Sequence, residues 1–167
     1  MIKTIVSMTK DRTIGLEGEL PWHIRKDLKY FFKKTKNHYL IVGRNTYESM
    51  TDKIRERKDS YELGYGRTPV ILTSDPDYKP REEEAVILTS KEAVLDFCQG
   101  KECFIIGGAS IYEQFLNHSE KMYITWVDID IVGDRFFPEI NWSDWILESS
   151  KKSKKDSRLT YEIFSRK

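Results

Sequence analysis

The 167-residue chain carries 28 Lys and Arg against 27 Asp and Glu, a formal charge of +1, with 39% hydrophobic and 13% aromatic residues. This balance gives no electrostatic reason to expect a nucleic-acid or membrane partner, and no apolar run approaches the roughly 20 residues of a membrane helix. A chain of this length is expected to form one domain whose core needs no metal or disulfide.

The first residues are typical of a strand and not of a targeting signal. Residues 1–8 are apolar and lack a cationic leader or a small-residue cleavage site, so we expect neither a signal peptide nor a transit peptide. Cys98 and Cys103 have four residues between them, which is neither the C-x-x-C redox spacing nor a zinc pattern with nearby histidines. We therefore expect reduced thiols, no metal site and a cytoplasmic protein.

Short apolar runs alternate with helical patterns over most of the chain. Continuous runs rich in β-branched residues are typical of buried strands, and apolar residues every three or four positions indicate helices. The expected strands are residues 4–8, 39–42, 70–73, 86–88 and 103–106. The expected helices are residues 25–36, 46–50, 91–98 and 110–116. This alternation predicts an α/β fold with a central mixed, mostly parallel β-sheet flanked by helices on both faces.

The last quarter of the chain changes character. Residues 122–130 alternate between the two faces of a strand, and residues 145–149 and 160–165 read as two long strands, which predicts an antiparallel C-terminal edge. The basic run at residues 151–158 fits a solvated hairpin better than a polyanion site. Charged residues and two glycines at residues 51–66 indicate a surface insertion within a single domain spanning residues 1–167.

Asp27 lies in the first expected helix, one turn before Phe31 and next to Leu28. This spacing places its carboxylate beside apolar side chains instead of on a fully solvated face. Two explanations remain open from spacing alone. Asp27 is either a first-turn acid that favours the helix dipole, or a partly desolvated carboxylate that binds a protonatable heterocycle.

Two expected strands end in glycine-containing junctions that start a helix. One reads Gly107-Gly108-Ala109-Ser110 and the other Gly43-Arg44-Asn45-Thr46. Glycine permits close backbone approach, a helix start attracts phosphate, and an arginine holds a phosphate dianion by charge-assisted bonds. A tight turn also needs small residues, and neither spacing is G-x-G-x-x-G. Two such junctions together suit a dinucleotide, which needs several anion sites along one sheet edge.

Taken together, these segments resemble the chromosomal type of dihydrofolate reductase over nearly the whole chain. The matching residues, in family order, are Ile14-Gly15, Leu20-Pro21-Trp22, Asp27, Val42-Gly43-Arg44, Thr46, Glu48-Ser49, Arg67, Ile106-Gly107-Gly108, Tyr112, Thr125, Gly133-Asp134 and Phe137-Pro138. The resemblance implies reduction of 7,8-dihydrofolate to 5,6,7,8-tetrahydrofolate by hydride transfer from NADPH with protonation at N5, in support of one-carbon metabolism and thymidylate synthesis. It also implies a monomer that binds antifolate inhibitors.

The same resemblance implies roles for individual residues at the substrate. Asp27 would bind the pterin's amino group and N3 and promote protonation at N5, assisted by Thr125 and by a water near Trp22. Arg67 matches the arginine that pairs with the glutamate carboxylate of the substrate. The remaining implied substrate contacts would look the same as core residues; they are Val6, Ser7, Leu28, Phe31, Met50, Ile54, Ile106 and Tyr112.

For the cofactor, the resemblance implies ribose-phosphate contacts from Arg44, Thr46 and Ser74, and a cis peptide bond between Gly107 and Gly108 in the pyrophosphate turn. Ser110 departs from the family, which often has an arginine there, and this leaves more of the phosphate binding to Arg44. The implied cofactor contacts are Ser7, Ile14, Gly15, Leu20, Gly43, Arg44, Asn45, Thr46, Thr73, Ser74, Ile106, Gly107, Gly108, Ala109, Ser110, Ile111 and Tyr112. Gly133 and Asp134 correspond to residues that steady the family's lid loop.

Two other functions fit parts of the pattern. A related NADPH-dependent pterin or pyrimidine reductase would share the fold, but the combination of Asp27 and Arg67 argues against another heterocycle. A non-catalytic NADPH-binding module would retain both glycine junctions and would have no need of an acid in an apolar wall.

Overall fold

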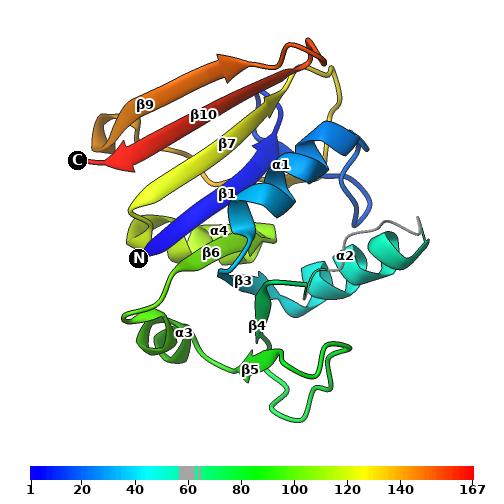
Figure 1. Cartoon of the computed structure of the whole chain (residues 1–167), viewed down its shortest axis with the longest axis vertical. Coiled ribbons are helices and arrows are strands. Elements are labelled where there is room, and N and C mark those ends of the chain that lie inside the picture. The colour runs from blue at the N-terminus through cyan, green and yellow to red at the C-terminus, as the bar shows by residue number, and fades with distance from the viewer. Residues whose placement is uncertain (57–62, 64) are drawn as a thin grey trace.

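The fold is built on an eight-stranded sheet with the strand order β5-β4-β3-β6-β1-β7-β10-β9 (Figure 1). The computed structural model describes residues 1–56, 63 and 65–167. The strands of this sheet are β1 (Ile2–Met8), β3 (Tyr39–Gly43), β4 (Thr68–Leu72), β5 (Val86–Leu88), β6 (Cys103–Gly107), β7 (Lys121–Val127), β9 (Trp145–Lys152) and β10 (Leu159–Arg166). The helices are α1 (Arg25–Thr35), α2 (Arg44–Glu56), α3 (Lys91–Cys98) and α4 (Ala109–Phe115), with 3-10 turns η1 (Leu116–His118) and η2 (Trp142–Asp144).

The pairing confirms the predicted mixed sheet. Strand β1 lies between β6 and β7 and is parallel to both, and β3, β4 and β5 continue the parallel part outward. Strand β10 pairs antiparallel with β7 and with β9, which forms the predicted antiparallel C-terminal edge. A separate pair of short strands, β2 (Thr13–Gly15) and β8 (Arg135–Phe136), was not predicted, because two or three residues carry no periodic signal.

Alternation along the parallel strands divides the core into two layers. On one face Ile41 of β3 and Ile105 of β6 pack with residues of α3 and α4. On the other face Leu40 and Phe104, one position earlier on the same strands, pack against residues of α1 and α2. Strand residues at successive positions point to opposite faces, so near-continuous apolar runs bury both sides. The prediction of helices on both faces is confirmed.

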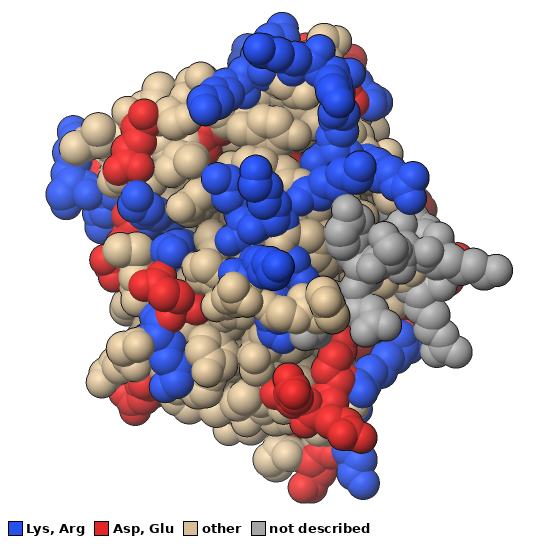
Figure 2. Space-filling model, viewed as in Figure 1, with Lys and Arg blue, Asp and Glu red and all other residues tan. Residues whose placement is uncertain are grey.

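The basic run lies at the tip of the β9–β10 hairpin. Lys151, Lys152, Lys154, Lys155 and Arg158 are all exposed, and Figure 2 shows Lys and Arg side chains over this end of the molecule. Asp156 accepts two hydrogen bonds from the side chain of Arg158, at 2.9 and 2.6 Å. The prediction of a solvated hairpin is confirmed.

The expected surface insertion is corrected in part. Residues 51–56 continue helix α2, and Thr51 is buried with its hydroxyl donating to the Tyr47 carbonyl oxygen at 3.0 Å. Leu63 is 1% exposed and belongs to the core layer beneath α2. The prediction of a surface insertion is therefore wrong for residues 51–56, because the apolar positions of α2 still form one stripe toward the sheet. Residues 57–62 and 64 lie outside the described residues.

Strand order fixes where side chains from different parts of the chain meet. Strands β1, β3, β4 and β6 run parallel, so their carboxyl ends share one edge of the sheet. The chain passes from β1 to β3 and later returns to place β6 between them, which makes this a topological switch point. Ligands of open α/β sheets bind at such a point, beyond the carboxyl ends of the strands.

Two further expectations concern cysteine and the membrane. Cys98 and Cys103 are both free and buried, as predicted. Within the described part of the chain, no helix has the length and apolar character needed to cross a membrane.

Candidate active site

Asp27 lies in the first turn of α1 and is partly buried. Its pKa is raised above the usual value by desolvation, and the neighbouring hydroxyls of Ser7 and Thr125 partly offset this rise. The Ser7 hydroxyl affects this pKa although it makes no hydrogen bond of normal geometry. Burial in weakly polar surroundings disfavours the ionised carboxylate, which is the condition for an acid that takes part in proton transfer.

Three buried polar atoms are unsatisfied, and two of them, on Ser7 and Tyr30, interact electrostatically with Asp27. Ser7 Oγ, Trp22 Nε1 and Tyr30 OH make no hydrogen bond with the described residues. The charge of Asp27 raises the pKa of Tyr30 further, after burial and the neighbouring tyrosines Tyr123 and Tyr161. Unpaired buried polar groups cost about 1–3 kcal/mol each, so a cluster of them is typical of a site that accepts a polar ligand.

The neighbours of Asp27 come from the centre of the sheet. Ser7 of β1 and Thr125 of β7 are register partners, and Thr125 is 2% exposed. Trp22 is buried with Val127, the last residue of β7, and Leu159, the first residue of β10, in a small cluster. Of the residues predicted as catalytic, Thr125 of β7 thus lies near Asp27 of α1, and Trp22 lies in the segment that precedes α1.

Several of the predicted substrate walls lie on one side of the sheet, in the layer of α1 and α2. Phe31, Met50 and Ile54 are partly buried against the core layer formed by α1 and α2, which also contains Ile106. Leu28 is half-buried in α1, whereas Val6 is buried and packs in the opposite layer. Its place in that layer gives Val6 a core role in addition to any contact with a ligand.

Arg67 has a structural role that the sequence did not indicate. It is 8% exposed, and its guanidinium donates from Nε to Thr35 Oγ1 at 2.9 Å and from Nη1 to the Tyr65 carbonyl at 2.6 Å. Nη2 donates to the Phe32 carbonyl, and the guanidinium lies 4.6 Å from the centroid of the Phe32 ring. Three of the five N–H groups of an arginine are used in this way, which holds the end of α1 to the start of β4.

The Gly107-Gly108 junction has the close packing expected of a nucleotide turn. The bond between the two glycines is cis, as predicted, and Gly107 has a φ of +113°. A Cβ on Gly107 would lie 3.0 Å from Tyr112 Cε2, and one on Gly108 would lie 2.7 Å from Thr46 Oγ1. The two junctions are therefore in contact, and packing this close requires glycine at both positions of the second junction. This arrangement fits the phosphates of NADPH.

The residues around this junction extend along the sheet edge. Tyr112 is buried, its hydroxyl donates to the Ile5 carbonyl at 2.8 Å, and Ile111 packs in the same core layer. Ala109 and Ser110 open α4, where Ser110 is exposed and accepts a hydrogen bond from Gln114 at 3.1 Å.

Helix α2 begins at Arg44, directly after Gly43 ends β3. Arg44 is half-buried and Asn45 is exposed. Thr73 and Ser74 follow β4, the neighbour of β3; the Thr73 backbone N–H donates to the Leu88 carbonyl at 3.0 Å, and Ser74 is exposed. The pairing of β3 with β4 thus brings together the residues predicted to bind the ribose phosphate.

The lid segment, residues 14–20, runs from β2 toward α1 and is held from two directions. Asp134 donates its backbone N–H to the Gly15 carbonyl at 2.9 Å and accepts from the Glu17 backbone at 3.0 Å. On the other side, Glu19 forms a 2.8 Å ion pair with Lys53 of α2. Within this lid segment Ile14 is partly buried, whereas Leu20 is 53% exposed.

Sequence reasoning missed two residues of this region. Tyr30 stacks on Tyr161 with ring centroids 4.3 Å apart, and its position three residues after Asp27 on α1 was a usable signal. Asp75 lies 3.7 Å from Arg44, measured from Oδ2 to Nη1, and no local pattern indicates this pair because the two residues belong to different strand ends.

A partly buried acid and a glycine turn between a parallel strand and a helix, linked through Tyr112, are typical of a nucleotide-dependent reductase of the α/β class. Comparison with known proteins narrows this class. Residues 1–166 match the family model described as dihydrofolate reductase. The chain is 37% identical over 163 residues to the dihydrofolate reductase of Bacillus subtilis, covering 97% of this chain and 90% of that one. It is 35% identical to the Staphylococcus haemolyticus enzyme, covering 98% and 92%.

A solved structure agrees with these sequences. Dihydrofolate reductase from Enterococcus faecalis, complexed with NADP(H) and RAB-propyl, superposes with a TM-score of 0.83 at 32% identity, covering 99% of this chain and 96% of that one. The chain belongs to the dihydrofolate reductase family. It is an NADPH-dependent oxidoreductase that reduces dihydrofolate to tetrahydrofolate.

Proposed function

We propose that Asp27 is the catalytic residue of this reductase, with Trp22 and Thr125 as its partners. The observation that carries the proposal is the desolvation of Asp27, which raises the pKa of its carboxyl beside the hydroxyls of Ser7 and Thr125. Its carboxylate would accept hydrogen bonds from the amino group and N3 of the pterin. A negative charge there favours a proton on the bound heterocycle and thereby assists protonation at N5.

NADPH, when bound, supplies the hydride that reaches carbon 6 of the pterin. The chain's part is to hold the two rings together and to exclude water. Leu28 and Phe31 of α1 would cover the pterin, and Ile106 with Tyr112 would border the nicotinamide. Arg67 would pair with the glutamate carboxylate of the substrate through its two remaining N–H groups.

The proposed cofactor contacts follow the two glycine junctions. The backbone of Gly107 and Gly108 would receive the pyrophosphate, and Arg44 with Thr46 and Ser74 would bind the ribose 2′-phosphate. The closeness of Thr46 to Gly108, where a Cβ would lie 2.7 Å from Thr46 Oγ1, supports one continuous binding surface. The lid segment with Ile14 and Leu20 would close over the nicotinamide, as loops of this kind often do.

Domain organisation, location, oligomeric state and inhibitor binding also belong to this proposal. We propose a single domain that acts as a cytoplasmic monomer, as membership of the dihydrofolate reductase family implies. Antifolates should bind, because they present a protonatable heterocycle to a carboxylate such as that of Asp27.

The decisive experiment follows loss of NADPH absorbance on addition of dihydrofolate. Wild-type protein should be active, and Asp27→Asn should lose most of the rate while binding NADPH as before. Asp52→Asn makes the same chemical change at an exposed carboxylate of α2 paired with Arg81, and should remain active. Equal rates in all three proteins would overturn the assignment of Asp27.

Arg44→Ala tests the cofactor assignment. Loss of a charge-assisted contact worth about 1.5–3 kcal/mol should weaken NADPH binding about 10- to 150-fold and leave NADH binding nearly unchanged. A similar loss for both cofactors would contradict the role of Arg44 at the 2′-phosphate.

A further inference from the structure

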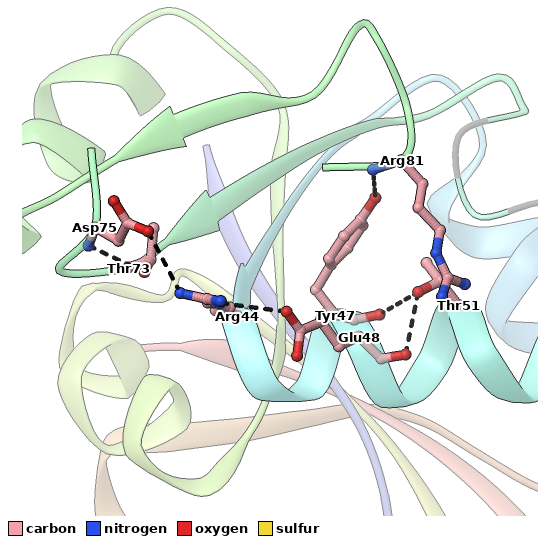
Figure 3. A network of polar contacts seen from close by, with 7 residues as sticks. All are labelled: Arg44, Tyr47, Glu48, Thr51, Thr73, Asp75 and Arg81. Carbon is pink, nitrogen blue, oxygen red and sulfur yellow. Dashed lines mark hydrogen bonds and ion pairs between the residues drawn. The ribbon is translucent and has the colours of Figure 1, made fainter. Parts of the chain in front are cut away.

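Two carboxylates already hold the guanidinium of Arg44. Its Nε donates to Glu48 Oε1 at 3.2 Å, and its Nη1 lies 3.7 Å from Asp75 Oδ2. Figure 3 shows Arg44 between these two acids, one from its own helix and one from the loop after β4. Arg44 also lies against Tyr78, with 4.3 Å between the guanidinium carbon and the ring centroid.

The two acids reach Arg44 for different reasons. Glu48 is one helical turn further along α2, the normal spacing for a side-chain pair on one helix face. Asp75 is brought from the neighbouring strand end, because β3 and β4 are aligned with Gly43 opposite Leu72. The residues that follow the two strands therefore face each other.

Asp75 is held in this position by its own turn. Its backbone N–H donates to Thr73 Oγ1 at 3.2 Å, and its Oδ1 accepts from the Asp77 backbone N–H at 2.9 Å. The second hydrogen bond is an Asx turn, which fixes the carboxylate relative to the backbone. The charge of Asp75 is thus a constant part of the surface around Arg44 and not a freely moving surface charge.

NADPH and NADH differ only at the 2′ position of the adenosine ribose, the group that Arg44 is proposed to bind. NADPH carries a phosphate on the adenosine ribose 2′ position, which an arginine binds, whereas NADH carries a hydroxyl there, which an acidic side chain binds. A carboxylate next to Arg44 repels the phosphate dianion and competes with it for the guanidinium. The same carboxylate is a suitable acceptor for a ribose hydroxyl.

We infer that Asp75 is a specificity-determining residue that narrows the preference of this reductase for NADPH over NADH. The inference rests on the proposed role of Arg44 at the 2′-phosphate. Asp75 weakens the binding of NADPH and supports the binding of NADH. The dissociation constants of the two cofactors are therefore closer to each other than they would be with Arg44 alone.

The test measures dissociation constants of NADPH and NADH by quenching of tryptophan fluorescence. Asp75→Asn keeps the size of the side chain and an acceptor for the Asp77 backbone, and it removes only the charge. NADPH should bind about 5- to 50-fold more tightly, an effect that shrinks in molar salt because the charges are partly exposed. NADH should bind no more tightly than to the wild type.

Matched variants make the result specific. Asp52→Asn removes the same charge from the same region, where Asp52 pairs with Arg81, and should change neither constant. Asp75→Ser repeats the loss of charge with a different acceptor and should also favour NADPH. Thermal unfolding of each variant checks that the fold is retained.

The outcomes separate the two proposals. If Arg44→Ala weakens NADPH selectively but the Asp75 variants change both cofactors equally or neither, the inference about Asp75 is wrong and the role of Arg44 stands. If Arg44→Ala weakens both cofactors alike, the phosphate site is elsewhere and both proposals fail.

Discussion

Gly133 lies against the backbone of Gly15, so that a Cβ on Gly133 would be 2.4 Å from the Gly15 carbonyl oxygen and 2.3 Å from Thr13 Cγ2. Gly133→Ala therefore cannot be accommodated unless β2 or the loop before β8 moves. Overpacking of this kind costs about 1–3 kcal/mol. We expect a lower midpoint of thermal unfolding and a change in turnover, because β2 leads into the lid segment.

The control for this prediction is Gly100→Ala, since nothing lies within 4 Å of a Cβ there, although its φ of +70° disfavours a side chain. Gly100→Ala should destabilise the protein through backbone strain and leave the turnover of the folded enzyme unchanged. Equal turnover in both variants would show that the contact between Gly133 and Gly15 does not position the lid.

Arg67 allows its structural and substrate roles to be separated. Arg67→Ala leaves the Phe32 and Tyr65 carbonyl oxygens without their donor, so we expect about 2–4 kcal/mol of destabilisation. Arg67→Lys keeps the charge but loses the planar fork that suits a carboxylate. It should raise the Michaelis constant for dihydrofolate and barely affect a pterin without the glutamate tail. An equal loss with the shortened pterin would assign Arg67 to structure alone.

Much of the fold was predictable because the parallel strands are apolar runs bounded by helical patterns. The run at 103–106 and the helix at 91–98 were found almost to the residue. The second half of α2 was not predicted, because its charged positions at Asp52, Lys53 and Glu56 mask the apolar stripe that packs on the sheet.

The site shows a similar division. The partly buried position of Asp27 follows from its helical spacing to Phe31. The two glycine junctions can be recognised as local motifs in the sequence. The pair of Arg44 with Asp75 is different, because it depends on the register of β3 with β4. That register cannot be read from the spacing of residues along the chain. The same holds for the three carbonyl and hydroxyl oxygens that hold Arg67.

Burial of Asp27 also predicts a cost to stability. Because burial raises the pKa of this carboxyl from its usual 3.8, the folded chain binds more protons than the unfolded chain between the two values. The free energy of unfolding therefore falls as pH rises from the usual pKa through the folded pKa. Above the folded pKa this contribution of Asp27 falls no further. Asp27→Asn should raise the midpoint of thermal unfolding of the free enzyme at neutral pH, with a difference that vanishes below the usual pKa.

Asp156 provides a control of opposite sign for this measurement. Hydrogen bonds from Arg158 lower the pKa of Asp156 to about 2, so its stabilising contribution is present above its usual pKa of 3.8 and is lost as pH falls toward 2. Asp156→Asn should lower the unfolding midpoint at neutral pH. Destabilisation by Asp27→Asn as well would mean that its carboxylate is a structural group in the free enzyme.

The activity of Asp27→Asn as a function of pH is the sharpest test of the proposed mechanism. The asparagine keeps the shape of the side chain beside Leu28 and Phe31 and removes its charge. If the carboxylate assists protonation at N5, the rate near neutral pH should fall roughly 10²- to 10⁴-fold, the usual contribution of one acid–base group. Because acidic solution protonates the substrate beforehand, the variant should regain activity as pH falls, while the wild type should show an ionisation that belongs to Asp27 and the bound substrate together. Rates that stay flat and close to those of the wild type across this range would reduce Asp27 to a helix-start acid.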